Sequence, residues 1–101
     1  MTAYFIATYD IADPVQYAQY NPGSNHITGS TVATHGGEII VATNDVLRLQ
    51  GSETAIKVII QFPSREAAQA WNNDPGYAAA KAIRLDSTAN INTFIVDKLE
   101  P

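Results

Sequence analysis

The sequence contains no cysteine, no lysine or arginine before Arg48, and no apolar run near the roughly 20 residues that a membrane-spanning helix needs. The first absence excludes disulfide bonds, thiolate metal sites and a cysteine nucleophile. Because the amino terminus lacks the basic region of a secretory or transit signal, we expect a cytoplasmic protein. The third absence leads us to expect no insertion into a membrane.

Positive charge is also scarce. Six lysines and arginines stand against ten aspartates and glutamates, which gives a formal net charge of −4. The cations are scattered, so no basic stripe can neutralise consecutive phosphates, and we expect no nucleic-acid partner. We attribute the acidity to solubility. A chain of 101 residues has room for a single core, so residues 1–101 are expected to form one domain.

The first third of the chain predicts a strand and an interrupted helix. Thr2 to Asp10 is rich in aromatic and β-branched residues and is apolar on both faces, as in a covered strand. Asp13 is a good helix N-cap, and Pro14 suits the first helical position. Asn21-Pro22-Gly23 then predicts a kink or break near Asn21, followed by a weak helix, because Ser24 to Thr34 is heavy in poor helix formers.

The middle of the chain predicts three strand segments. Gly36-Gly37 supplies a left-handed helix end. Glu38 to Thr43 and Val46 to Gln50 are expected as two short strand pieces around a turn at Asn44-Asp45. Ala55 to Phe62 is the clearest strand, since one of its faces is wholly apolar and the other is half polar.

The last third predicts two helices and a closing strand. Ser64 is expected to cap a helix that carries Trp71 on its apolar stripe. Asp74-Pro75 repeats the Asp-Pro start signal and predicts a further helix to about Leu85. Ile91 to Val96 is expected as the final strand.

The order strand, helix, strand, strand, helix, strand is the split βαβ pattern of α+β proteins with ferredoxin-like topology. In that arrangement an antiparallel sheet is covered by helices on one face only. Several strands carry apolar residues on both sides, and large exposed apolar patches are rare on monomers. We therefore predict a homodimer that forms through the open sheet face.

Residues distributed over nearly the whole chain resemble those of a bacterial family called domain of unknown function 1330. The matching positions are Asp13-Pro14, Tyr17, Tyr20, His35-Gly36-Gly37, Phe62-Pro63-Ser64, Ala67-Ala68, Ala70-Trp71, Asp74-Pro75, Tyr77, Lys81-Ala82 and Arg84. The resemblance implies a dimeric α+β barrel, in which two ferredoxin-like sheets pack face to face, and it implies no established activity. The stretch Asn21 to Thr31 departs from the family pattern, and we expect it to be either a lid over a pocket or a disordered segment.

Tyr77, Lys81 and Arg84 recur at i, i+4 and i+7 and so lie on one stripe of the last predicted helix. Such a stripe can hold a carboxylate or a phosphate. The alternative is that Lys81 and Arg84 are solvated or pair with Asp86. The resemblance includes Arg84, whose planar guanidinium suits a carboxylate or a partner across the dimer, so Arg84 is our candidate for an anion-binding catalytic residue.

His35 precedes Gly36 at the end of the first helical region and is the best candidate for a general base. The alternative is a helix-ending histidine with no catalytic duty. His26 lies nine residues earlier, where a regular helix would turn it to the opposite side. Two histidines without cysteine fall short of a usual zinc set, so we expect no metal site.

Four aromatic residues, Tyr17, Tyr20, Trp71 and Tyr77, are candidates for the walls of a substrate pocket. The alternative is that these aromatic side chains belong to the core. The sequence has no nucleophile elbow, phosphate loop or dinucleotide fingerprint, so we expect no cofactor. Haem handling is a weaker hypothesis, because a proximal histidine would have to face an open pocket.

Two functions remain open. The first is the binding or conversion of a small organic molecule, a carboxylate or an aromatic compound, in a cleft between helices and sheet, with His35 as proton acceptor and Arg84 as anion anchor. The second is a non-catalytic binding or assembly protein, in which the same residues build the core and the dimer interface. The fold alone cannot decide between them.

Overall fold

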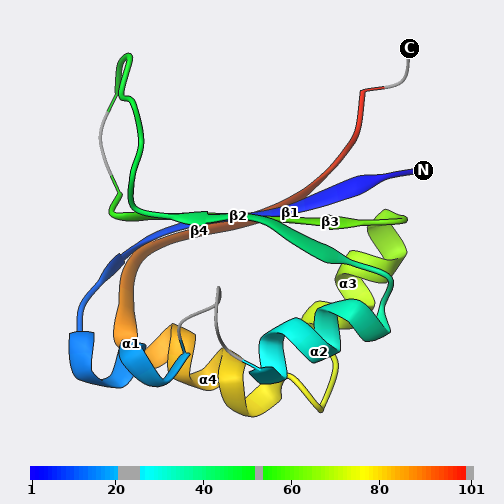
Figure 1. The fold of residues 1–101 in the computed structure, drawn as a ribbon, viewed down its shortest axis with the longest axis horizontal. Coiled ribbons are helices and arrows are strands. Elements are labelled where there is room, and N and C mark those ends of the chain that lie inside the picture. Colours follow the sequence, from blue (N-terminus) through cyan, green and yellow to red (C-terminus); the bar gives the residue numbers. More distant parts are fainter. Residues whose placement is uncertain (21–25, 52–53, 100–101) are drawn as a thin grey trace.

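The computed structural model describes residues 1–20, 26–51 and 54–99 and arranges them as a four-stranded antiparallel sheet with helices on one face (Figure 1). The strands are β1 (Ala3–Ile11), β2 (Glu38–Thr43), β3 (Ile56–Phe62) and β4 (Thr88–Asp97). The helices are α1 (Pro14–Tyr20), α2 (His26–Thr34), α3 (Arg65–Asn72) and α4 (Ala78–Ser87). Among the described residues, no helix has the length and apolar character to cross a membrane.

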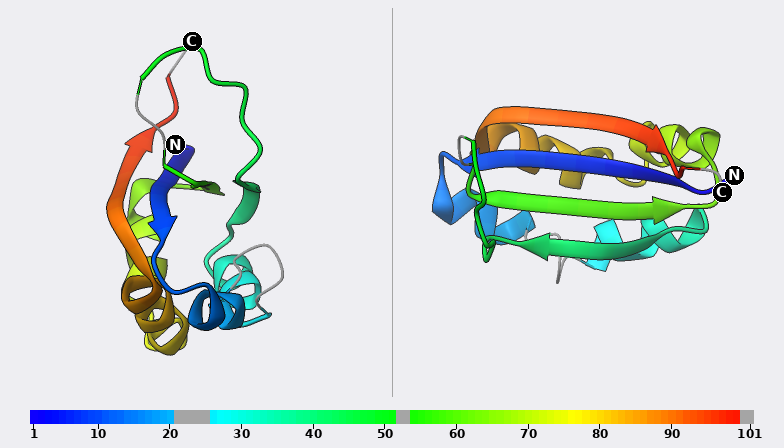
Figure 2. Two further views of the ribbon diagram at one scale, coloured as in Figure 1. Left: turned by 90° about the vertical axis from the view of Figure 1, so that its left-hand side faces the viewer. Right: turned by 90° about the horizontal axis from the view of Figure 1, so that it is seen from above.

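The strand order is β2-β3-β1-β4, with every neighbouring pair antiparallel (Figure 2). Each connection that crosses the sheet carries two short helices, α1 with α2 and α3 with α4. This is the ferredoxin-like α+β topology, and it confirms the predicted fold class. The end of β1, helix α1 and the end of α4 lie close together at one end of the helix layer (Figure 1), where the Ser87 carbonyl accepts from the Ala12 and Asp13 N–H groups.

The core lies between the sheet and the helices. In β1 the side chains of Phe5, Ala7 and Tyr9 are buried, while the alternating Tyr4 and Ile6 point to the other face and are only partly covered. The strand is therefore apolar on both faces, as predicted, but only one of these faces is closed by helices.

Two of the three predicted helix starts are confirmed. The Asp13 carboxylate accepts a hydrogen bond from the Gln16 backbone N–H at 3.1 Å, which caps α1. The Ser64 hydroxyl accepts from the Ala67 N–H at 3.0 Å, which caps α3. In each first turn, one free amide hydrogen is thus satisfied by the side chain that the sequence indicated.

The third predicted start, at Asp74-Pro75, is wrong by three residues. The Asp74 carbonyl accepts from the Tyr77 N–H, which closes a turn, and α4 begins only at Ala78. The Asp74 carboxylate accepts from the Gly76 N–H at 2.7 Å and also contacts His35. The side chain that was expected to cap the helix therefore stabilises a turn in front of it.

The first crossover agrees with the predicted interruption as far as the structure describes it. Helix α1 ends at Tyr20, and α2 begins at His26, whereas the predicted break at Asn21 lies outside the described residues. The segment from His26 to Thr34 is helical, so this part of the irregular stretch is an ordered element. The predicted left-handed helix end is confirmed, because Gly36 has φ +76°.

The predicted strand from Val46 to Gln50 is wrong. These residues form no strand and are exposed. The strand before them, β2, is at the edge of the sheet and pairs only with β3, and residues 46–50 do not pair with its outer edge. The segment instead leaves the sheet and stands on the side opposite the helices (Figure 1).

Candidate functional site

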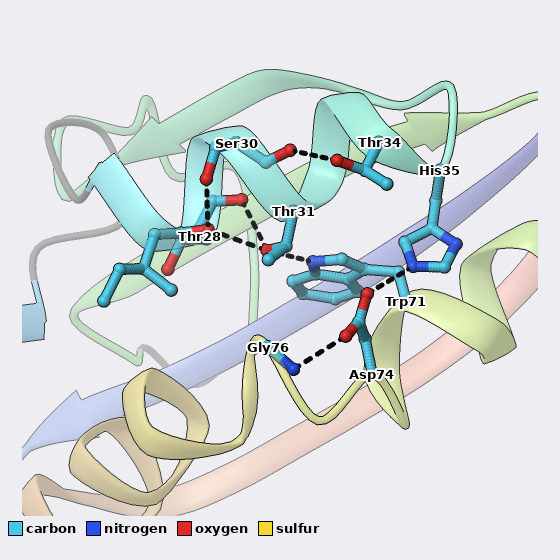
Figure 3. A network of polar contacts seen from close by, with 9 residues as sticks. Thr28, Ser30, Thr31, Thr34, His35, Trp71, Asp74 and Gly76 are labelled. Carbon is cyan, nitrogen blue, oxygen red and sulfur yellow. Dashed lines mark hydrogen bonds and ion pairs between the residues drawn. The ribbon is translucent and has the colours of Figure 1, made fainter.

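Trp71 forms the centre of the core beneath α2. Its ring stacks on Tyr77 with centroids 4.3 Å apart and meets Phe5 edge-on at 5.1 Å. The indole Nε1 donates a hydrogen bond to the Thr31 hydroxyl at 3.2 Å (Figure 3). Because Trp71 is fully buried and has its polar atom satisfied by α2, the structure places it in the core.

Two pairs of tyrosine hydroxyls lie next to this stack. Tyr9 and Tyr17 share a hydrogen bond of 2.7 Å between their hydroxyl oxygens, and Tyr20 and Tyr77 share one of 3.1 Å. All four side chains are buried. The pairs join β1 to α1 and α1 to the start of α4, so elements far apart in the sequence meet at one polar cluster inside the core.

Arg84 extends from α4 into this cluster. Only 3% of its surface is exposed, and its Nε and Nη1 atoms have no hydrogen-bond partner among the described residues. Tyr77, Tyr20 and Tyr9 are the groups whose charges act on it most strongly, and a hydrogen bond joins it to Tyr77. Buried arginine is uncommon without a paired carboxylate, so this guanidinium requires an explanation.

Arg84 brings a positive charge into the cluster at neutral pH. Burial alone would lower the pKa of Arg84, but its electrostatic interactions with Tyr77 and Tyr20 and its hydrogen bond with Tyr77 outweigh this, and the pKa is raised above its usual value. Burial also raises the pKa of Tyr9 and of Tyr20, so these phenols stay neutral near pH 7. The guanidinium is thus protonated while the phenols of Tyr9 and Tyr20 are uncharged.

The stripe predicted on the last helix is divided by the structure. Tyr77 and Arg84 are buried together, whereas Lys81 is partly exposed and its ammonium donates to the Asn72 carbonyl at 3.1 Å. The alternative of a solvated Arg84 is wrong, because the side chain points into the core.

His35 belongs to a separate polar centre. Its Nε2 lies 2.7 Å from Oδ2 of Asp74, and both side chains are partly buried (Figure 3). The hydrogen bond with His35, together with the Gly76 N–H, lowers the pKa of Asp74. No hydrogen bond or ion pair in the described part of the chain links His35 to Arg84, so the structure does not join the two residues predicted to act together.

Sequence reasoning missed three residues of these centres: Tyr9, Thr31 and Asp74. Tyr9 shares the phase of Phe5 and Ala7 on β1, which is a signal that its side chain lies inside. Asp74 was interpreted only as a cap, and its pairing with His35 depends on how α2 and the turn before α4 meet. Thr31 gave no local signal, because its partner Trp71 is distant in sequence.

Two surface depressions formed by described residues have volumes of about 370 and 310 Å³. The first lies near Met1 and Arg65, and the second runs along α4 past Asp74 and Lys81. Arg84 lines neither, because it lies beneath the surface. Within the described ranges, no group of three or more His, Cys, Asp or Glu side chains is placed to hold a metal ion.

The sheet order and single helix layer define an α+β protein with a ferredoxin-like fold, and solved structures share it. A protein of unknown function from Rhodopseudomonas palustris is 19% identical to this chain and superposes on it with a TM-score of 0.73. The match covers 99% of this chain and 84% of the Rhodopseudomonas palustris chain. A proposed antibiotic biosynthesis monooxygenase from Caulobacter crescentus CB15 is 19% identical with a TM-score of 0.68, covering 98% and 91%. A dimeric ferredoxin-like protein of unknown function from Bacteroides fragilis is 12% identical with a TM-score of 0.62, covering 96% of each chain.

The chain belongs to the family named domain of unknown function (DUF1330), whose family model matches residues 2–99. This match over nearly the whole chain confirms the predicted family. A search among curated proteins gave no match. At these identities the structural likenesses establish the fold.

Proposed function

We propose that the protein binds a small organic anion, a carboxylate or an aromatic acid, between the helices and the sheet, with Arg84 as its anchor. The observation that carries this proposal is the buried Arg84 guanidinium, two of whose nitrogens lack a partner among the described residues. A planar guanidinium suits the oxygens of a carboxylate.

Electrostatics favours an anion over a neutral ligand. Removing a cation from water costs several kcal/mol unless opposite charge and hydrogen bonds replace its hydration. The phenols of Tyr9 and Tyr20 beside Arg84 supply oxygen dipoles but no negative charge near pH 7. An anion beside Nε or Nη1 of Arg84 would supply both the opposite charge and the missing hydrogen-bond acceptors. Since Arg84 is almost fully covered, such a ligand enters by displacing a covering side chain.

The predicted aromatic residues receive distinct roles in this proposal. The hydroxyls of Tyr20 and Tyr77 orient the anion beside the guanidinium, and the rings of Tyr17 and Trp71 form the apolar walls. The support for these roles is that the two hydroxyl pairs and the Trp71–Tyr77 stack are contiguous with Arg84.

His35 is proposed as the proton acceptor if the ligand is also converted. The Asp74 carboxylate accepts a hydrogen bond from Nε2 of His35, which favours the tautomer of His35 that carries its proton on Nε2. Nδ1 is then the nitrogen that takes up a proton from the ligand. Because His35 and Arg84 belong to separate centres, conversion requires a ligand that reaches from one to the other. Oxygen uptake is the first activity to assay, since one structural neighbour is a proposed monooxygenase.

Calorimetric titration with benzoate and salicylate tests the binding step, with uncharged benzamide as the control ligand. We expect Arg84→Met to weaken binding by roughly 10- to 100-fold, the range for a lost charge-assisted hydrogen bond. Arg65→Met is the matched control, because Arg65 is exposed and pairs with Asp97. Equal binding by the wild type and Arg84→Met, or no binding of either carboxylate by the wild type, would contradict the proposal.

The second candidate is a non-catalytic assembly protein, and the open sheet face favours it. On that face Ile6 of β1 lies between Ile59 of β3 and Phe94 of β4, and Val96 follows Phe94 at the next outward position. Large exposed apolar patches are uncommon on monomers. We propose that two copies pair through this face, as supported by the dimeric description of the Bacteroides fragilis neighbour. Under the assembly alternative, His35→Ala changes stability only, and neither carboxylate binds.

A further inference from the structure

Residues 44–51 form an arm whose apolar side chains are exposed. The arm follows β2 and stands on the side of the sheet opposite the helices (Figure 1). Leu47 and Leu49 are 90% and 88% exposed, and Val46 beside them is also exposed. These are the apolar residues that led the sequence to predict a strand here.

The carboxyl-terminal residues rise on the same side of the sheet (Figures 1 and 2). Leu99 follows β4, the strand at the other edge of the sheet from β2, and is 90% exposed. Apolar side chains therefore stand both on the open face and on the segments that rise beside it. Solvent-exposed leucines of this kind mark a protein contact when they gather around an apolar face.

We propose that the arm is an intersubunit clasp, and that Leu47 and Leu49 pack on the second copy of the chain in the dimer. This inference rests on the dimer proposed above. The arm is long enough for the contact: six extended residues from Asp45 to Gln50 span about 20 Å, and two sheets packed face to face lie about 10 Å apart. An arm that stands out from its own open face must then pass alongside the partner's sheet.

The size of the open face favours a clasp. The sheet is four strands wide at about 4.8 Å per strand, and β3 is seven residues long at about 3.3 Å per residue. The product of this width and this length is a flat area of about 450 Å². A stable interface buries about 800 Å² on each partner. The sheet face is thus of modest size for a stable dimer, and the two arms, related by a two-fold axis, add buried apolar area to it.

Sedimentation equilibrium of a variant that carries Leu47→Ser and Leu49→Ser tests the clasp. We expect the dimer dissociation constant to rise by roughly 100-fold or more, because burial of each leucine contributes on the order of tenfold or more in affinity. Val15→Ser is the matched control, since Val15 is 80% exposed on α1, on the helix side of the sheet. An unchanged dissociation constant in the double variant would overturn the clasp.

Cross-linking gives an independent measurement, because the chain contains no cysteine that would react in the background. Leu47→Cys labelled with a benzophenone maleimide, mixed with an unlabelled tagged copy, should yield a cross-linked heterodimer, and Val15→Cys should not. A wild-type dimer without this product would refute the clasp and leave the open-face dimer standing. A monomeric wild type would refute both.

Discussion

At the scale of single residues, Arg84 is a charge that the fold has removed from water without a counter-charge among the described residues. The cost falls on the folded state, since the unfolded chain hydrates the guanidinium fully. Tyrosine hydroxyls recover part of that hydration through their dipoles. A residue retained at such a cost suits a binding role better than a structural one, which is a pattern often found at functional sites.

We expect Arg84→Met to leave the free energy of unfolding unchanged or to raise it by about 1–3 kcal/mol, because an apolar side chain of similar length removes a buried, uncompensated charge. Urea unfolding monitored by Trp71 fluorescence measures this. Phe62→Ala, which empties a fully buried position, is the control and should cost about 3–5 kcal/mol. A loss of more than about 3 kcal/mol in Arg84→Met would show that the guanidinium stabilises the fold.

At the scale of elements, the junction of α2 with β2 depends on two consecutive glycines that act differently. Gly36 takes the left-handed conformation that ends α2. Gly37 is required for space: a Cβ there would lie 2.7 Å from Cε1 of Phe62 and 2.9 Å from Cγ1 of Val32. The helix can therefore approach the sheet closely only where the side chain is a hydrogen atom.

Gly37→Ala should destabilise the protein by about 1–3 kcal/mol, because the added methyl overpacks the core between Phe62 and Val32. Gly29→Ala is the contrasting control: it lies within α2 with nothing within 4 Å of the added Cβ, so it should stabilise by roughly 0.5–1 kcal/mol through helix propensity. Thermal or urea unfolding of the two variants measures the difference. Equal effects would mean that the close approach at Gly37 does not limit packing.

At the scale of the whole molecule, Asp10 connects three strands at one end of the sheet. Its Oδ1 accepts from the Ala55 N–H, just before β3, and its Oδ2 accepts from the Asn90 side chain on β4, both at 2.8 Å. The hydrogen bond from Asn90, followed by the one from Ala55, lowers the pKa of the Asp10 carboxyl below its ordinary value of 3.8. The ionised carboxylate thus helps to hold β1, β3 and β4 together.

The sign of the resulting pH dependence follows from the direction of this shift. Since the folded pKa lies below the unfolded one, the unfolded state takes up the proton first as the pH falls below about 4, and stability falls with it. We expect Asp10→Asn to be less stable than the wild type at pH 6 and to lose less stability between pH 6 and pH 3. Urea midpoints across that range measure both slopes, and parallel curves for the two proteins would contradict the role of Asp10.

Local sequence patterns predicted the fold class, the sheet strands β1 to β4 and the caps of α1 and α3, because these features rest on local periodicity and on hydrogen bonds three residues apart. Arg84, His35 and the tyrosines could likewise be singled out as candidates from their chemistry and positions. What the sequence could not show is which of them meet. The pairs Tyr9–Tyr17, Tyr20–Tyr77 and His35–Asp74 join different elements, and two of them span dozens of residues.

Two outcomes became visible only in the folded chain: Arg84 is buried, and residues 46–50 form no strand. A helical stripe with two cations looks the same whether it faces solvent or core, and the outcome depends on α1 packing against α4. Residues 46–50 do not pair with the free outer edge of β2, so an apolar segment beside an available edge does not by that alone become a strand. Pairing and burial are set by competition among distant segments, which local pattern does not record.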